Sequence, residues 1–507
     1  MYIWAHGKNP KNIIYTPMKK HIVALTALLS VSSLWSQQKK IDYVEYDLAN
    51  GLHVILHEEH TVPIAAVSIM YHVGSKNEKA DRTGFAHFFE HLLFEGSENI
   101  KRGEYSALVE KNGGELNANT SNDRTYYYEV LPSNQLELGL WLESERLLHA
   151  KVETTGIETQ RSVVKEEKRQ RVDNQPYATF IGEIFKRMFI VHPYNWQPIG
   201  SMEHLDAAVE KDYIDFYRTF YVPANSTLSI AGDINIEQTK KWISKYFSTI
   251  PKGQAINLFR DFETLSNEAF LSKYAVDKSK FDSKDFMNSK DPIAKKLIAA
   301  ESAKPTTIPR PEKPTEKTGG VTKDIIYDNI QLPALFMAYR LPAETSKDFP
   351  ALEMLSEILS GGSSSRMNKV IVEKKQMAMQ VFTFAYGLED AGLGIFGAIG
   401  SNDVNLDTLQ IELDTQIDLI KKELISQEEF EKIRNQFENQ IVTSNSSIEG
   451  ICENLANNYV YFGNANRVNN LLESYMKVTR EDIQRVAVQY LTQDARIILN
   501  YLPKKTN

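Results

Sequence analysis

Short apolar runs and longer segments with a helical stripe follow one another along this chain and predict a mixture of strands and helices. Residues 54–56 and 65–71 are apolar or alternating in the manner of strands, and residues 226–231 return to that pattern. Between them, residues 136–148 and the charged segment 159–171 are expected to be helices. This order predicts an α+β fold: a mainly antiparallel sheet with helices packed on one face.

The same pattern returns in the second half of the chain. Residues 333–339 echo residues 63–71, and an apolar helix expected at 351–359 ends at Gly361, as an earlier apolar segment ends at Gly96. We therefore expect two homologous domains, at 42–253 and 321–504.

The tract between these domains, 254–320, has a different composition. Lys, Asp and Ser dominate residues 271–290, and four prolines follow at positions 305, 309, 311 and 314. Such a tract predicts a mobile or partly helical insert. We expect a solvated linker rather than a docking site for a partner.

Length and composition are those of a folded protein with more than one core. At 507 residues the chain suits two domains, and its net charge of −8 gives no reason to expect nucleic acid or an anionic membrane as a partner. The single cysteine, Cys452, excludes a disulfide framework or a cysteine-based zinc site, and we expect it to be a small core residue.

The N-terminal residues are typical of an export signal. Met18, Lys19 and Lys20 precede an apolar run at 22–34, and Ser36-Gln37 is a suitable cleavage site. We therefore expect residues 1–36 to contain a signal peptide that starts at Met18, and a periplasmic or secreted protein. The alternative is a membrane-anchored N-terminus, which the short apolar run disfavours.

The strongest chemical signal is an H-x-x-E-H sequence formed by His87, Glu90 and His91. On a helix the two histidines lie one turn apart on one face, where two imidazoles can hold one Zn²⁺ and Glu90 can take a proton from water. Thr83 is placed to cap such a helix and Gly96 to end it. The alternative is two core histidines beside a surface glutamate. Catalytic zinc also requires a third protein ligand.

With a second motif, the chain resembles the pitrilysin–insulysin zinc peptidases, and within them the mitochondrial processing peptidase and its bacterial relatives. H-x-x-E-H is followed by an R-x-V-V-x-E-E segment at 161–167, which places Glu167 76 positions after His91. The resemblance implies that Glu167 is the third ligand, with Glu166 as the alternative one residue away. The supporting carboxylate that this family often has before the third ligand is replaced here by Gln160, so that support would come from Glu158 or elsewhere.

Further blocks extend the resemblance over residues 42–253 and 320–503. They are G-G-x-x-N-A-x-T-S at 113–121, T-x-Y-Y at 125–128, H-P-Y at 192–194 and G-G-S-S-x-R at 361–366. The resemblance implies one Zn²⁺ per chain and two like domains that form half of a clamshell. In the repeat, Leu352, Leu355 and Ser356 stand where His87, Glu90 and His91 stand in the first domain, so the second domain is expected to bind no metal.

The resemblance also implies how a peptide is held. Residues 116–120 would form a sheet edge on which an extended substrate adds as a strand, with Asn117, Ala118 and Asn119 as substrate-binding residues. Such binding favours short or unfolded peptides. The alternative is that Asn117 and Asn119 are ordinary turn residues.

One departure from the family bears on partners. Members usually supply an Arg and a Tyr, seven residues apart, that polarise the substrate carbonyl; here Val372 and Met379 occupy those places. We therefore expect a zinc subunit of a heterodimeric metalloendopeptidase whose partner brings the pair. The alternatives are a self-sufficient homodimeric peptidase and a non-catalytic scaffold subunit of the same fold.

Overall fold

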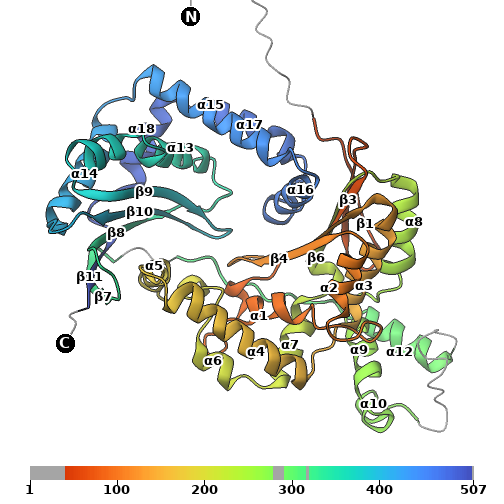
Figure 1. Ribbon diagram of the computed structural model, residues 1–507. Coiled ribbons are helices and arrows are strands. Elements are labelled where there is room, and N and C mark those ends of the chain that lie inside the picture. Colours follow the sequence, from red (N-terminus) through yellow and green to blue (C-terminus); the bar gives the residue numbers. More distant parts are fainter. Residues whose placement is uncertain (1–39, 278–290, 316–318, 505–507) are drawn as a thin grey trace, which may run out of the picture. The chain divides into compact units, whose positions relative to one another are not determined.

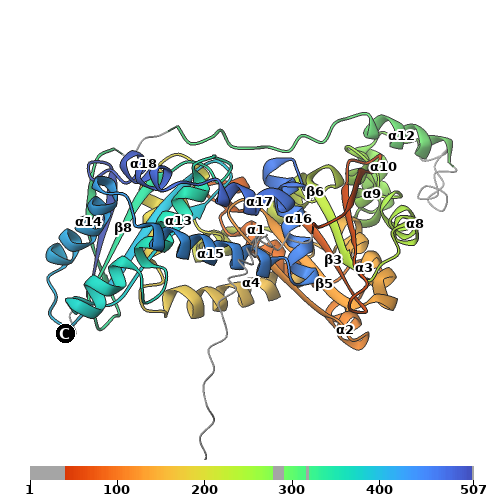
Figure 2. The same ribbon diagram turned by 90° about the horizontal axis from the view of Figure 1, so that it is seen from above.

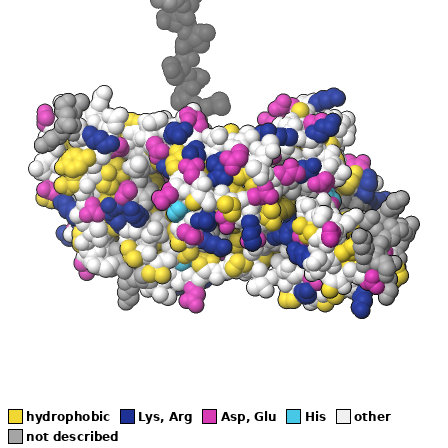
Figure 3. Space-filling model, turned by 90° about the horizontal axis from the view of Figure 1, so that it is seen from below, with side chains coloured by type: hydrophobic (Ala, Val, Ile, Leu, Met, Phe, Trp, Pro, Cys, Tyr) yellow, Lys and Arg dark blue, Asp and Glu magenta, His cyan; other side chains and the backbone are white. Residues whose placement is uncertain are grey.

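The computed structural model describes residues 40–277, 291–315 and 319–504. The export signal expected at 1–36 lies outside these residues. Among the described residues, no helix is both long enough and apolar enough to cross a membrane. Figure 3 shows one face of the molecule, on which side chains of both charges are interspersed rather than gathered into a basic patch.

The first sheet has six strands and holds an exposed edge at β4. Its order is β1-β2-β6-β3-β5-β4, and every neighbouring pair is antiparallel except β2 and β6. The strands are β1 (Val44–Asp47), β2 (His53–Glu58), β3 (Ile64–Tyr71), β4 (Glu115–Thr120), β5 (Thr125–Pro132) and β6 (Ser226–Gly232).

The second sheet repeats the first without the outermost strand. Its order is β7-β11-β8-β10-β9, with β7 and β11 as the parallel pair, so it matches β2-β6-β3-β5-β4 strand for strand. The strands are β7 (Thr322–Asp328), β8 (Ala334–Leu341), β9 (Ala378–Gly387), β10 (Gly392–Gly400) and β11 (Arg496–Pro503). The predicted α+β fold with two homologous, mainly antiparallel sheets is confirmed.

Helices cover one face of the first sheet and enclose its main core. Val54, Val67 and Ile69 point from the strands into this core, where they meet side chains of α1, α3, α7 and α8. The helices of this half are α1 (Phe85–Leu92), α2 (Glu104–Lys111), α3 (Leu136–His149), α4 (Thr154–Lys168), α5 (Phe180–Met188), α6 (Met202–Ala207), α7 (Glu210–Phe220) and α8 (Ile236–Phe247).

The second sheet is covered in the same way. Its core takes side chains from α13 (Phe349–Ser360), α14 (Leu406–Lys422), α15 (Gln427–Ser444), α17 (Arg467–Met476) and α18 (Arg480–Tyr490). Leu352 and Leu355 of α13 are each 2% exposed in this core. The repeat of the histidine helix is therefore an apolar packing helix.

Each half also gives one helix to the other half's sheet (Figure 1). Helix α16 (Ile448–Phe462) covers the second face of the first sheet, where Leu455 packs with Ile55 and Ala66. Helix α5 packs against the second sheet in the same manner. Cys452 of α16 is fully buried in this layer, which confirms it as a core residue.

The described part of the tract 254–320 is mostly helical and docked. It contains α9 (Ala255–Thr264), α10 (Asn267–Lys273) and α12 (Pro292–Ser302). Ile256 and Phe259 of α9 join the first core, and buried Arg260 donates to the carbonyls of Leu147 (2.8 Å) and Tyr221 (2.6 Å). These helices agree with a partly helical insert, but they are docked and do not form a solvated linker. Residues 303–315 are the longest described stretch of the tract without helix or strand (Figure 2).

Candidate metal centre

Helix α1 carries H-x-x-E-H, and its start is set by a residue outside the motif. Gly84 precedes it with φ of 95°, and the buried carboxylate of Glu78 accepts hydrogen bonds from the backbone N–H groups of Gly84 and Ala86, both at 2.9 Å. The predicted cap, Thr83, instead bonds His204 through its hydroxyl at 2.8 Å. Burial raises the pKa of Glu78 to about 8, against the lowering effect of these hydrogen bonds.

The other end of α1 is held by two buried groups. The helix ends at Leu92, short of the predicted stop at Gly96. The Tyr127 hydroxyl donates to the carbonyl of Phe89 at 2.8 Å, and Arg146 donates to that of Leu93 at 3.1 Å. These bonds satisfy carbonyls that the end of a helix leaves open. The helix that carries the histidines is therefore fixed at both ends from the surrounding core.

The two histidines face one point, as the spacing predicts. The rings of His87 and His91 have their centroids 4.9 Å apart with planes at 81°. The ligand-type atoms of His87, Glu90 and His91 all lie within 4.8 Å of one another. Glu90 therefore stands beside the paired imidazoles, where it can exchange a proton with a group that they hold.

Glu167 joins this pair from α4, while Glu166 does not. Glu167 Oε2 lies 3.1 Å from Nε2 of His91 and 3.5 Å from Nε2 of His87. Its other oxygen meets Arg171 at 2.9 Å, in the π-helical turn Arg169–Asp173 that continues α4. Glu166 is directed to solvent, where it pairs with Arg169 at 3.1 Å. The neighbouring imidazoles, His87 first, hold the pKa of Glu167 well below its ordinary value.

The atoms gathered here fit a zinc ion. Two imidazole nitrogens and one carboxylate oxygen are a ligand set that catalytic zinc uses, with a fourth position left for water or substrate. Among the described residues, no aligned hydrogen-bond donor reaches the buried Oε2 atom of Glu167.

Glu95 is the carboxylate beside Gln160, and the sequence did not predict this contact. Glu158 faces away and pairs with Arg161 at 3.1 Å. Gln160 donates instead to Glu95 Oε1 at 2.5 Å, and its own Oε1 is buried without a partner among the described residues. The sequence could have indicated Glu95 through its spacing, because it lies four positions after His91, about the length of one helical turn.

The residues expected to bind substrate lie on the exposed edge strand β4, beside α1. The backbone N–H of Ala118 donates to the side-chain Oδ1 of Asn117 at 2.9 Å. That N–H therefore points away from β5, toward the free edge. Asn117 and Asn119 are strand residues and not turn residues.

Val372 and Met379, the positions that correspond to the Arg and Tyr of the family, lie in different environments. Val372 belongs to a π-helical segment, Asn368–Lys374, and packs against the second core. Met379 is 66% exposed on β9, the edge strand of the second sheet. Neither side chain carries a hydrogen-bond donor, so neither can polarise a carbonyl.

Two family models match the chain. The model described as Insulinase (Peptidase family M16) matches residues 53–196, and the model described as Peptidase M16 inactive domain matches residues 209–437. The first match contains α1 and Glu167. The second covers parts of both halves, from α7 to α15.

Among similar proteins, the chain is 27% identical to the zinc protease PqqE of Helicobacter pylori over 487 residues, which are 95% of this chain and 98% of that protein. A crystal structure of a protease from Helicobacter pylori matches with a TM-score of 0.76 and 26% identity, over 91% of this chain and 100% of that chain. The periplasmic protease PqqL from Escherichia coli shares the fold, with a TM-score of 0.65 and 16% identity, over 92% of this chain but 48% of that chain.

Proposed function

Because this chain belongs to the peptidase M16 family, we propose that it is a zinc-dependent endopeptidase or oligopeptidase acting on extended or unfolded peptides. The observation that carries the proposal is the approach of Glu167 to His87 and His91, with Glu90 on the same helical turn. A packing role for two core histidines would not bring a second carboxylate from another helix to the same point.

In the proposed site, His87, His91 and Glu167 would hold one zinc ion per chain. Zinc held in this way would supply Lewis acidity, which activates water and polarises a carbonyl. Glu90 accepts the proton of the attacking water and delivers it to the leaving amine. The hydrogen bond from Gln160 to Glu95 links α4 to the segment that follows α1.

The substrate is proposed to lie along β4. A peptide that adds as a strand would bond to the outward N–H of Ala118, displacing the Asn117 side chain that holds it now. Main-chain pairing of this kind reads little sequence and requires an extended peptide. This accounts for the proposed preference for short or unfolded chains.

We further propose a heterodimer in which a homologous subunit supplies the groups absent at Val372 and Met379. The apolar side chains at both positions support this, as does the fold match that spans 48% of the PqqL chain. A homodimer active by itself is the competing arrangement. The residues 1–36 support export to the periplasm or beyond, with 42–253 as the catalytic domain and 321–504 as its metal-free counterpart.

The decisive experiment combines metal analysis with cleavage of an unstructured peptide mixture. The pure wild-type chain is expected to contain one equivalent of zinc, and His87→Ala is expected to lose it while keeping its circular-dichroism spectrum. His60→Ala is the matched control, because His60 is exposed and its partners are Glu58 and Asp233. Retention of zinc by His87→Ala would refute the ligand assignment.

Cleavage then separates the remaining alternatives. Zinc with no cleavage by the pure chain, and activity restored by a homologous subunit, is expected for the heterodimer. Chelator-sensitive cleavage by the pure chain, abolished in Glu90→Gln, would overturn the partner requirement but keep the peptidase. If the pure chain neither contains zinc nor cleaves peptides, the alternative of a non-catalytic scaffold subunit is supported.

A further inference from the structure

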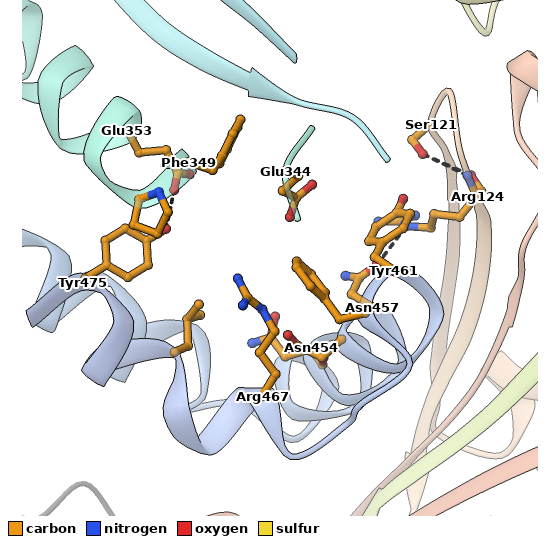
Figure 4. Close-up of a pocket in the computed structure, with 14 residues that line it drawn as sticks. Ser121, Arg124, Glu344, Phe349, Glu353, Asn454, Asn457, Tyr461, Arg467 and Tyr475 are labelled. Atoms are coloured by element: carbon orange, nitrogen blue, oxygen red, sulfur yellow. Dashed lines mark hydrogen bonds between the residues drawn. The ribbon is translucent and has the colours of Figure 1, made fainter. Parts of the chain in front are cut away.

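A cavity of about 300 Å³ lies away from the metal site, at the turn between β4 and β5. Figure 4 shows it between that turn, α13, α16 and α17. Its volume is at the small end of the range in which proteins bind small molecules. None of His87, Glu90, His91 and Glu167 lines it.

Arg467 of α17 directs its guanidinium into this cavity (Figure 4). Among the described residues, it makes no ion pair or hydrogen bond through its side chain; its Nε is buried without a partner. The guanidinium carbon lies 3.7 Å from the ring centroid of Phe462, which supports it from one side. Burial lowers the pKa of Arg467, which expresses the cost of keeping this charge away from water.

Glu344 faces Arg467 in the same cavity without touching it (Figure 4). Its carboxyl group has no side-chain hydrogen bond or ion pair among the described residues. Burial, and then the charge of Asp123, raise the pKa of Glu344, although Arg467 and Arg124 act in the opposite direction. Two groups of opposite charge therefore stand opposite each other with space between them.

The other polar groups of the cavity are already engaged or supply a neutral donor. Glu353 accepts a hydrogen bond from the Tyr475 hydroxyl. Arg124 is paired with Glu453 at 2.7 Å and donates from Nε to Asn457 Oδ1 at 3.2 Å. The amide nitrogen of Asn457 has no partner among the described residues. Arg467 and Glu344 are thus the charges left to bind something.

A partly buried charge without a partner carries part of the cost of desolvation, and a ligand that pairs with both charges offsets this cost at each of them. We infer that this cavity binds a small zwitterion, an α-amino acid or a dipeptide. Its carboxylate meets the guanidinium fork of Arg467, where two parallel hydrogen bonds form, and its ammonium group meets Glu344. Phe349 and Leu471 provide apolar walls for the ligand's side chain.

This inference does not rest on the proposed peptidase function, although a peptidase releases products of this class. The binding charges come from α17 and from the segment before α13, and the metal ligands come from α1 and α4. Either site can therefore be tested with the other disabled.

The test is calorimetric titration of the full-length Glu90→Gln protein, which is not expected to hydrolyse its ligand. The probes are phenylalanine, alanyl-phenylalanine, and this dipeptide with either an acetylated N-terminus or an amidated C-terminus. We expect one site per chain for phenylalanine or alanyl-phenylalanine. Each blocked dipeptide is expected to bind at least tenfold more weakly than the free one, since each leaves one buried charge unpaired.

Two variants assign each end of the ligand. Arg467→Gln is expected to bind the free and the amidated dipeptide equally, and Glu344→Gln the free and the acetylated dipeptide equally. A merely misfolded cavity would weaken all probes together and would not remove one preference alone. Lys477→Gln is the matched control at the end of the same helix, because Lys477 is exposed and pairs with Glu473.

The outcomes separate this site from the metal centre. Equal binding of free and blocked dipeptides by the Glu90→Gln protein, or no binding of any probe, would overturn the inference. Dipeptide binding unchanged by both variants would assign it to another site and would also overturn it. If the probes bind as expected but the wild type contains no zinc and cleaves no peptide, the zwitterion site is supported and the proposed peptidase function is refuted.

Discussion

Glu166 and Glu167 are neighbours in the chain, yet one side chain is exposed to solvent and the other lies in the candidate metal centre. Glu167 is 15% exposed beside two imidazoles, whereas Glu166 is 54% exposed and pairs with Arg169 on the helix surface. One position is 100° of helical rotation, which is enough to move a carboxylate from the site to solvent. The motif restricted the choice to these two residues, and the packing of α4 against α1 decides it.

Substitution of these two glutamates is the first test at this scale. Glu167→Gln is expected to lower zinc from one equivalent to a small fraction, because an amide is a poor substitute for an anionic ligand. Glu166→Gln is expected to keep the full equivalent. Metal analysis after gel filtration measures both; equal zinc in the two variants would show that Glu167 is not a ligand.

Glu78 gives a second test, on the pH dependence of stability. Burial raises its pKa from 4.5 to about 8, so the folded protein binds a proton there that the unfolded chain releases. The stability contributed by this proton is fully present below pH 4.5 and is lost as the pH rises through 8. In that window the wild type should lose free energy of unfolding relative to Glu78→Gln, by on the order of 1 kcal/mol per pH unit.

Denaturant unfolding of both proteins at pH 5, 6, 7 and 8 measures this difference. Glu110→Gln, an exposed change on α2, is the control and should leave the slope of the wild type intact. A difference between Glu78→Gln and wild type that stays constant across these pH values would contradict the assignment.

Strand β4 is the element that would connect the proposed metal site to a substrate. The sequence predicts a strand edge there, but only the pairing with β5 shows which backbone groups are free. Because Ala118 N–H bonds to the Asn117 side chain, it takes no part in the ladder with β5. An edge strand can accept proline at such a position without losing a ladder hydrogen bond.

Ala118→Pro is therefore expected to separate substrate binding from folding. It should lower kcat/KM for an unstructured peptide by about tenfold or more, since one main-chain hydrogen bond to the substrate is lost. Zinc content and the melting temperature should change little. Ala118→Ser, which keeps the N–H, should retain activity; unchanged kcat/KM in the proline variant would rule out strand addition at this position.

At the scale of the whole molecule, the two halves are joined through exchanged helices. Leu455 of α16 lies in the second half of the chain but is fully buried against Ile55 and Ala66 of the first sheet. The α5 helix makes the reciprocal contact. The halves should therefore unfold together rather than as independent domains.

Leu455→Ala tests this coupling. Loss of a fully buried leucine should cost about 2–5 kcal/mol of unfolding free energy, and it should raise hydrogen exchange in β3 and β6 although the mutation lies in α16. Leu419→Ala, a half-exposed change on α14, is the control. Faster exchange confined to α16 and its own half would show that the sheets are stable without the exchanged helix.

The sequence by itself determined the local features of this protein. Binary patterning predicts the strands and the repeat, since side chains alternate along a strand and return every turn of a helix. The four-residue spacing from His87 to His91 fixes two imidazoles on one helix face for the same reason. Cys452 as a core residue follows from residue type alone.

The tertiary structure decided what depends on contacts between distant segments. Glu78 replaces Thr83 as the cap of α1, Glu95 rather than Glu158 is the carboxylate beside Gln160, and α9 docks where a linker was expected. Arg467 and Glu344 are separated by 123 residues, and no periodicity relates them. Local patterns carry the propensity of each element, whereas the pairing of elements is set by which faces bury together, and that is a property of the whole chain.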